Sequence, residues 1–272
     1  MQNNTQEVTF MKLKIAIAQI DIALGRPQIN QKTITDYAKK AADAGADVLI
    51  YPEMWNTGYA LTALDTLADV DGVNSQQVLS QLAKTYQLNI IGGSVAILRD
   101  GDFYNTMYIF DKNGQKVQEY DKLHLFGLMN EGQYITSGTK TNSFKLAGVP
   151  SAGAICYDIR FPEWLRTIMA PGPQEILYIA AQWPIQRINQ WQILLQARAI
   201  ENQAFVVAAN RVGYDDHNVF GGSSLIIDPL GRIVQQAGEE ETLLVAEINT
   251  NDEQDVRGEI PVFSDRRPEL YQ

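Results

Sequence analysis

Cys156 is the only cysteine of the chain, and it stands where an apolar run meets a polar turn, in the segment GAICYDIRFP at residues 153–162. A side chain at the end of a strand that turns into a helix lies at the carboxyl edge of a sheet, where the next backbone N–H groups point outward. A thiol placed there can act as a nucleophile, and it can equally be an inert core side chain. The other reactive residues of the chain decide between these two interpretations.

Two further segments place a charged group at the end of an apolar run, Glu53 in VLIYPE (48–53) and Lys122 in YDKLHLF (120–126). A carboxylate beside a buried sheet edge has a raised proton affinity and can serve as a general base near neutral pH. A lysine in an apolar stretch can stabilise an oxyanion. Taken singly, Glu53 can also be a solvated loop residue, and Lys122 can cover apolar surface with its stem.

Together, these three residues form a chemically complete set. The carboxylate of Glu53 takes the thiol proton, the thiolate of Cys156 attacks a carbonyl carbon, and the ammonium of Lys122 stabilises the oxyanion with a backbone N–H. This chemistry is acyl transfer by a thiol. A Cys–His pair remains an alternative, because His124 lies two residues from the lysine and His217 lies in a polar loop.

The elements that must position these residues are short apolar runs that alternate with helix-like stretches. Strands are predicted at 14–22, 47–52, 89–98, 103–110, 151–156, 175–181, 204–209, 223–228 and 242–248, and helices at 30–44, 75–86, 162–169 and 187–202. The turn signals DKNG (111–114) and DPLG (228–231) lie between paired strands. The pattern therefore predicts an α/β layered domain with mixed sheets.

Composition bounds the remaining possibilities. The 272 residues are 45% hydrophobic and 20% charged, and we interpret residues 11–272 as one domain with a C-terminal tail from about Asn251, with residues 1–10 as an N-terminal extension. One cysteine permits neither an intrachain disulfide nor a multi-thiolate zinc site, so we expect a cytoplasmic protein. The net charge of -10 argues against nucleic-acid and anionic-membrane partners, and no apolar run approaches the length of a membrane span. A small-molecule partner is expected, with no metal or cofactor.

Three segments, YPEMW (51–55), YDKLHLF (120–126) and ICYDIRFPE (155–163), resemble in content and order the Glu, Lys and Cys motifs of the nitrilase, or carbon–nitrogen hydrolase, superfamily. The resemblance runs from about Lys14 to Tyr271, and it includes QARAIENQ (196–203) and IPVF (260–263). It implies a four-layer α-β-β-α sandwich that assembles as a homodimer or larger homo-oligomer.

The resemblance also implies residue roles. Glu53 would be the base, Lys122 the oxyanion stabiliser and Cys156 the nucleophile. The superfamily has a second glutamate after the lysine motif, and NEG at 130–132 matches it at Glu131, which would position the lysine or the substrate. The backbone N–H of Tyr157 would be the second oxyanion donor.

Within the superfamily, Trp183-Pro184 and the run from Arg198 to Arg211 look most like the bacterial omega-amidase branch. Such enzymes hydrolyse the terminal amide of 2-oxoglutaramate or 2-oxosuccinamate through a thioester, releasing ammonia and a 2-oxo dicarboxylate. A substrate of this kind needs a cation for its distal carboxylate, and the candidates near predicted strand ends are Arg160, Arg187 and Arg211. Trp183 would form a wall of the pocket or fill the core.

Other activities share the same three residues. A nitrilase, an aliphatic amidase and an N-carbamoyl amide hydrolase remain alternatives, because each reaction passes through attack by the same thiol. A non-catalytic scaffold with the same fold is the remaining alternative from a different class, and the intact Glu53, Lys122 and Cys156 argue against it.

Overall fold

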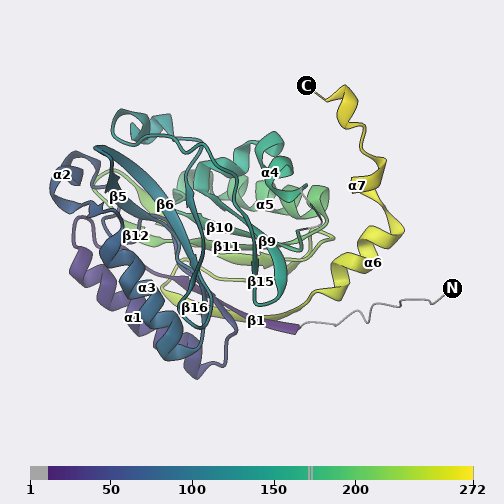
Figure 1. Ribbon diagram of the computed structural model, residues 1–272, viewed down its shortest axis with the longest axis horizontal. Coiled ribbons are helices and arrows are strands. Elements are labelled where there is room, and N and C mark those ends of the chain that lie inside the picture. Colours follow the sequence, from purple (N-terminus) through teal and green to yellow (C-terminus); the bar gives the residue numbers. More distant parts are fainter. Residues whose placement is uncertain (1–11, 171, 173, 272) are drawn as a thin grey trace.

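Two mixed β-sheets pack face to face, and each carries a pair of helices on its outer side (Figure 1). The computed structural model describes residues 12–170, 172 and 174–271. The expected extension at residues 1–10 lies outside them. The four layers confirm the predicted α-β-β-α sandwich with mixed sheets.

The first sheet has eight strands in the order β16-β1-β2-β4-β6-β5-β3, with β7 paired to β6. Its central pairs, β1 with β2 and β2 with β4, are parallel, and its outer pairs are largely antiparallel. The strand bounds are β1 (Lys12–Gln19), β2 (Val48–Ile50), β3 (Asp69–Val70), β4 (Asn89–Ile91), β5 (Val95–Arg99), β6 (Asp102–Phe110), β7 (Lys116–Asp121) and β16 (Thr242–Asn249).

The second sheet has six strands in the order β15-β14-β11-β10-β9-β8, and β12 and β13 form a separate hairpin. Strand β10 is parallel to both β9 and β11 and is buried along its whole length, as expected for a strand covered on both faces. The bounds are β8 (Ser143–Leu146), β9 (Val149–Ile155), β10 (Ile176–Ala181), β11 (Phe205–Asn210), β12 (Val212–Tyr214), β13 (Val219–Gly221), β14 (Leu225–Ile227) and β15 (Ile233–Gln236).

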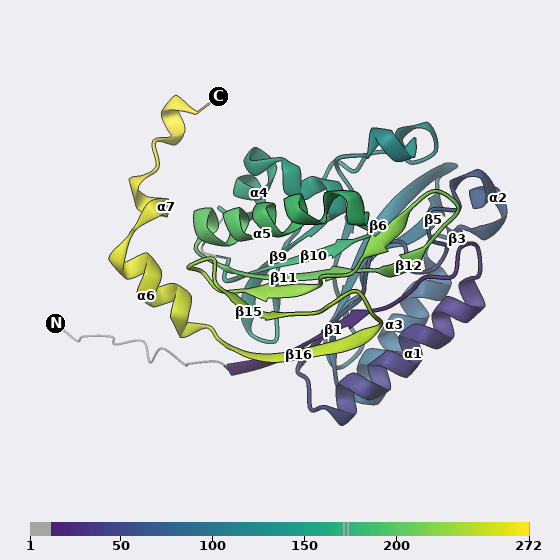
Figure 2. The ribbon, with the colours of Figure 1, turned by 180° about the vertical axis from the view of Figure 1, so that it is seen from behind.

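Helices α1 (Pro27–Asp43) and α3 (Val73–Tyr86) cover the first sheet, and α4 (Pro162–Met169) and α5 (Ile188–Asn202) cover the second (Figures 1 and 2). Each of these four corresponds to a predicted helix. Their buried residues recur at helical spacing, as in Ile34, Ala38 and Ala41 of α1. A short helix, α2 (Leu64–Leu67), and several 3₁₀ turns lie in the connections.

One predicted strand is wrong. The run at 89–98 forms two strands, β4 and β5, because the chain turns at residues 92–94. Gly93 has a positive φ of 62°, and a Cβ on it would lie 2.1 Å from the carbonyl oxygen of Pro52. The turn thereby lets the two backbones touch, and the N–H of Trp55 donates to Ser94 O at 2.9 Å. This contact supports the loop that carries Glu53.

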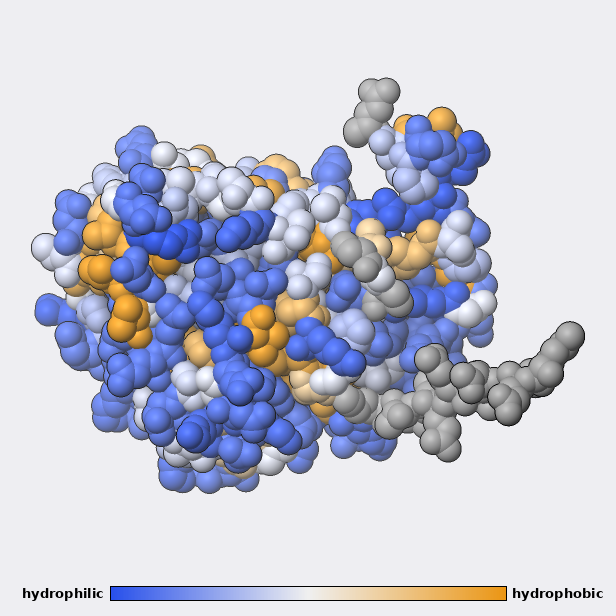
Figure 3. Space-filling model, in the orientation of Figure 1, coloured by the Kyte–Doolittle hydropathy of each residue, from blue (hydrophilic) through white to orange (hydrophobic). Residues whose placement is uncertain are grey.

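The segment after β16 forms α6 (Asn251–Glu259), α7 (Val262–Asp265) and a 3₁₀ turn at its end, and it runs along one side of the sandwich (Figure 2). Arg257 attaches it to the body by donating to Gln174 O at 2.7 Å. Within the described ranges, every helix is too short or too polar to cross a membrane. On the surface, polar side chains dominate the face in Figure 3, with separate apolar patches between them.

Candidate active site

Cys156 directly follows β9 and begins the 3₁₀ turn η4 (Cys156–Arg160), where its side chain is only 6% exposed. Its φ is +44°, a left-handed conformation that is uncommon for a residue other than glycine. Asp158 stabilises the turn, since its Oδ2 accepts a hydrogen bond from Ile155 N at 2.9 Å. The predicted strand end is therefore present, and the sharp turn holds the thiol at the carboxyl edge of the sheet.

Glu53 lies three residues after β2 and is fully buried. Its Oε1 accepts three hydrogen bonds, from Tyr59 OH at 2.7 Å, Lys122 Nζ at 2.8 Å and Asn105 Nδ2 at 3.0 Å. Its Oε2 accepts one, from Gln182 N at 2.9 Å. A carboxylate has about four lone-pair sites on two oxygens. Oε1 is therefore fully occupied, and Oε2 is the atom with capacity left to take a proton.

Lys122 directly follows β7, and its side chain is fully buried between two carboxylates. Besides Glu53, its Nζ contacts Glu131 Oε2 at 2.7 Å and Oε1 at 3.0 Å. Glu131 begins the 3₁₀ turn η3 (Glu131–Gln133), and its Oε2 also accepts the N–H of Phe126 at 2.8 Å. The structure thus brings the expected Glu53, Lys122, Glu131 and Cys156 into one cluster.

The pKa values of this cluster follow from burial and charge. Burial raises the pKa of Cys156 well above its ordinary value and the Glu53 carboxylate raises it further, against the opposing effect of Lys122. Burial alone lowers the pKa of Lys122, but the carboxylates of Glu131 and Glu53 outweigh it and raise the pKa. Burial also raises the pKa of Glu131, which Lys122 counteracts. The resting thiol is therefore protonated, and its activation requires a base.

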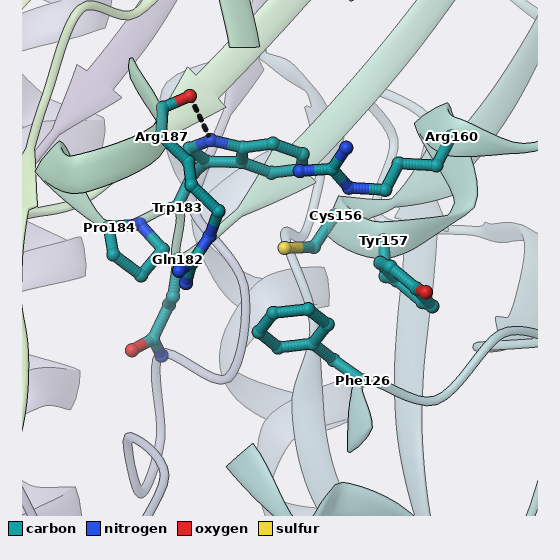
Figure 4. A pocket seen from close by; sticks show the side chains of 8 residues that line it. All are labelled: Phe126, Cys156, Tyr157, Arg160, Gln182, Trp183, Pro184 and Arg187. Atoms are coloured by element: carbon teal, nitrogen blue, oxygen red, sulfur yellow. Dashed lines mark hydrogen bonds between the residues drawn. The ribbon is translucent and has the colours of Figure 1, made fainter. Parts of the chain in front are cut away.

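A narrow recess lies over the thiol and opens to solvent. Figure 4 shows the sulfur of Cys156 pointing into it, with Trp183 on one side and Phe126 on the other. The lining residues are Phe126, Cys156, Tyr157, Arg160, Gln182, Trp183, Pro184 and Arg187. Four of the five expected substrate-binding residues are among them.

Two arginines and no carboxylate line this recess, in a chain whose net charge is -10. The guanidinium of Arg160 stacks over Trp183 at 4.8 Å from the ring centre and donates to Gln190 Oε1 at 2.7 Å. The guanidinium of Arg187 lies over the ring of Phe126 at 5.4 Å. Within the described residues, Arg187 has no ion pair. The local charge therefore favours an anionic ligand.

Arg211, the fifth expected substrate-binding residue, does not line the recess. It is fully buried, and its Nη2 pairs with Asp21 Oδ1 at 2.6 Å. Its Nη1 donates to Gln182 Oε1 at 3.0 Å, and Gln182 in turn donates from Nε2 to the backbone oxygen of Glu53 at 2.7 Å. Arg211 was expected near a substrate carboxylate, but its charge is already paired, and it instead supports the loop that carries Glu53.

Sequence reasoning missed three residues of the site: Tyr59, Asn105 and Gln182. The clearest signal was Asn105, which is a polar side chain in the middle of the apolar run predicted as a strand at 103–110. A buried polar residue in such a run needs a hydrogen-bond partner. Tyr59 gave no comparable signal, because its contact with Glu53 arises only from the fold of the loop.

The two histidines are occupied elsewhere. His124 Nδ1 lies 2.8 Å from Asp158 Oδ1, and its ring stacks on Phe161 with 3.7 Å between the centroids. His217 lies in an exposed turn, where its backbone N–H donates to Asp215 Oδ1. Among the described residues, neither histidine forms a hydrogen bond with Cys156, whereas the carboxylate of Glu53 acts directly on its pKa. The same part of the chain holds no group of three or more His, Cys, Asp or Glu side chains suited to a metal ion.

Comparisons with known proteins agree with this geometry. The family model described as "Carbon-nitrogen hydrolase" matches residues 14–258. A "2-oxoglutaramate amidase" of Bacillus subtilis is 48% identical over 261 residues, which cover 96% of this chain and 100% of that protein. A "2-oxoglutaramate amidase" of Paenarthrobacter nicotinovorans is 31% identical, covering 95% and 91%. The solved structure of a CN-hydrolase superfamily protein from Xanthomonas campestris superimposes with a TM-score of 0.88 at 28% identity, covering 94% and 98%.

Proposed function

Because the chain belongs to the carbon–nitrogen hydrolase family and is thus a hydrolase of carbon–nitrogen bonds, we propose that it hydrolyses the terminal amide of a small 2-oxo acid, such as 2-oxoglutaramate or 2-oxosuccinamate. The products are ammonia and a 2-oxo dicarboxylate. One observation carries the proposal, the recess over Cys156 lined by two arginines and no carboxylate. It suits a substrate with an amide at one end and a carboxylate at the other.

The first half of the reaction forms a thioester. Oε2 of Glu53 takes the proton of the Cys156 thiol, and the sulfur attacks the amide carbon as the carbonyl π electrons move to oxygen. The charge of Lys122 and the N–H of Tyr157 stabilise that oxyanion. The oxyanion then re-forms the carbonyl, the C–N bond breaks, and the protonated Glu53 gives its proton to the departing nitrogen. Ammonia leaves, and an acyl-enzyme remains.

The second half is hydrolysis. Glu53, again ionised, takes a proton from a water molecule whose oxygen attacks the thioester carbon. The same Lys122 and Tyr157 groups stabilise the second oxyanion, and its collapse breaks the C–S bond. Glu53 returns the proton to sulfur, which restores the thiol. Proton transfer between Cys156 and Glu53 leaves the net charge of the cluster unchanged, which matters because the cluster is buried.

Arg187 is the better candidate for the distal carboxylate. Among the described residues its guanidinium contacts only the ring of Phe126, whereas that of Arg160 already donates to Gln190 and stacks on Trp183. A carboxylate at Arg187 would therefore gain a charge-assisted hydrogen bond without breaking an existing one. Arg160 then supports the pocket wall from the opposite side, as Figure 4 shows.

The test is ammonia release from 2-oxoglutaramate, compared with butyramide, an N-carbamoyl amino acid and an aliphatic nitrile, in the wild type and in the Arg187→Gln variant. We expect KM for 2-oxoglutaramate to rise by about 10- to 100-fold in the variant, because one or two charge-assisted hydrogen bonds to the substrate are lost. KM for butyramide, which has no carboxylate, should be unchanged. Arg232→Gln removes an exposed arginine paired with Asp228 and is the matched control. Turnover confined to another compound, or equal effects on both amides, would refute the substrate assignment.

We also infer that the protein is a cytoplasmic homo-oligomer, most simply a homodimer. Ile193 and Ile200 remain exposed on the outer side of α5, an apolar surface that a second copy can cover. Light scattering coupled to gel filtration measures the mass directly, and fractionation of the producing cells measures the location. A mass of one chain, about 30.4 kDa, or recovery outside the cytoplasm would contradict the respective inference.

A further inference from the structure

Asn105 contacts all three charged residues that surround the thiol. It lies within β6 opposite Ala96 of β5, and it is fully buried. Its Nδ2 lies 3.0 Å from Glu53 Oε1 and 3.1 Å from Glu131 Oε1. Its backbone oxygen also accepts the N–H of Lys122 at 2.9 Å. One amide group therefore bridges the two carboxylates, and the same residue anchors the backbone of the lysine between them.

The orientation of this amide follows from its neighbours. An Asn amide can be placed in two orientations, and the hydrogen-bond network decides between them. The reverse orientation would direct Oδ1 of Asn105 at Oε1 of Glu53 and Oε1 of Glu131. Three oxygen atoms would then face one another with no hydrogen between them. Within the described residues, Oδ1 has no hydrogen-bond partner in the orientation observed. The site therefore leaves one buried acceptor unsatisfied, so that both amide hydrogens can go to the carboxylates.

Two buried carboxylates beside one lysine face a specific problem. Like charges held this close tend to share a proton, which raises one of the two pKa values. Burial and the nearby Glu53 both act in that direction on the pKa of Glu131. A proton held between the pair would leave Glu53 unable to accept one from the thiol. The amide contacts the titratable groups Glu53 and Glu131, and the titratable groups that interact with these two carboxylates are Tyr59, Lys122 and Cys156.

The hydrogen-bond pattern opposes such sharing. The Oε1 atoms of both Glu53 and Glu131 accept hydrogen bonds from the Asn105 amide and from Lys122 Nζ. Among the described residues, every partner of these two atoms except the Tyr59 hydroxyl can only donate. A proton placed on either Oε1 would point at another hydrogen. Carboxylate oxygens that accept hydrogen bonds from surrounding donors in this way are stabilised in their ionised form.

We propose that Asn105 is a positioning residue that keeps Glu53 and Glu131 ionised and separate by donating one amide hydrogen to each, so that Glu53 is ready to take the thiol proton. The proposal rests on Glu53 being the base in the proposed function. It does not depend on which amide is the substrate. It assigns the polar residue in the middle of β6 a role in the ionisation of the site rather than in binding.

The experiment compares Asn105→Leu and Asn105→Asp with the wild type from about pH 5 to about pH 9. This range spans the region between the ordinary pKa values of carboxyl and thiol groups. Two readouts are followed: kcat/KM for the best amide substrate, and the rate at which iodoacetamide alkylates Cys156. Asn89→Leu is the matched control. Asn89 is a buried asparagine in the neighbouring strand β4. In the part of the chain that the structure describes, its side chain bonds only backbone groups, Asp47 O and Lys112 N.

We expect the acid limb of both profiles to move to higher pH by about one unit in Asn105→Leu, which is about a tenfold loss of rate on the acid side. Asn105→Asp keeps the shape of the side chain but adds a third carboxyl group, so its loss at neutral pH should be larger still. Asn89→Leu should lose thermal stability and keep the wild-type pH profile.

An Asn105→Leu variant that is folded by circular dichroism and retains the wild-type acid limb would overturn the proposal. So would an Asn105→Asp variant with wild-type rates, because that result would assign the residue a role of shape alone. The alkylation readout separates this failure from that of the proposed function. If the oxo-amide is not the substrate, the alkylation profiles still shift, whereas if Asn105 has no role in ionisation, they coincide.

Discussion

Replacement of Lys122 by methionine tests the buried charge cluster most directly. Methionine keeps an unbranched side chain of similar length but removes the cation that lies 2.8 Å from Glu53 Oε1 and 2.7 Å from Glu131 Oε2. All three side chains are fully buried, so water cannot replace the lost partner without rearrangement of the site. We expect the Lys122→Met variant to be inactive and destabilised.

The magnitude follows from the geometry. Removal of one partner of a buried ion pair costs about 3–5 kcal/mol of unfolding free energy, because the remaining charge stays buried without compensation. A change of 1 kcal/mol shifts Tm by about 2–4 °C in a domain of this size class, so the expected fall in Tm at pH 7 is about 10 °C. Lys39→Met, at an exposed lysine paired with Asp43, is the control and should leave Tm nearly unchanged.

The change of the stability deficit with pH distinguishes an effect of uncompensated charge from an effect of packing. In the wild type, the raised pKa of Lys122 means that its stabilisation is complete below 10.5 and is lost only as the pH rises through the folded value. Without the lysine, the pKa of Glu131, already raised above 4.5, should rise further. A carboxyl group with a raised pKa binds more protons folded than unfolded, so stability increases as the pH falls. The deficit of Lys122→Met should therefore shrink from pH 8 toward pH 5.

The assay is thermal unfolding of wild type, Lys122→Met and Lys39→Met across that pH range, with ammonia release measured in parallel. A deficit in Tm that stays constant with pH would mean that the methionine acts through packing and not through uncompensated charge. An unchanged Tm at pH 7 would refute the reasoning altogether.

Three further predictions follow from the proposed roles. Cys156→Ser should reduce turnover by at least roughly 10³-fold while leaving Tm nearly unchanged, and near wild-type turnover would exclude the thiol as nucleophile. Glu53→Gln should be similarly inactive, whereas His217→Ala should keep wild-type kcat and His124→Asn should lose less than Glu53→Gln; a histidine variant as inactive as Glu53→Gln would support a Cys–His pair instead. Incubation with EDTA followed by gel filtration should leave kcat unchanged, and activity restored only by added metal would contradict the metal-free mechanism.

Much of the architecture was predictable from local pattern. Alternating apolar runs and amphipathic stretches located the four long helices, because burial of one face is a property of spacing along the chain. The break between β4 and β5 was not predictable in this way. Apolar, strand-forming runs flank the short segment at residues 92–94, and its turn is fixed by the close approach of the Pro52 backbone from the loop after β2.

Some residues of the candidate site were likewise predictable from sequence, and others were not. Cys156 and Lys122 each directly follow a strand and Glu53 follows one within three residues, so their type and position in the sequence predicted the cluster before any contact was known. The arginines could not be separated by sequence, since Arg160, Arg187 and Arg211 all lie near strand ends. Only the structure shows that Arg211 is already paired with Asp21 and that the other two line the recess.

The sequence by itself determined the chemistry: one thiol, one carboxylate and one lysine at the ends of buried strands, in an order that resembles a known family. These properties are local, because residue type and strand ends are encoded within a few positions. The tertiary structure decided which of these groups form hydrogen bonds and ion pairs with one another. Asn105 lies 52 residues from Glu53 and 26 from Glu131 in the chain, yet its amide bridges them. Such contacts depend on the strand order of the first sheet, in which only β4 separates β2 from β6, and burial of the cluster is what shifts its pKa values.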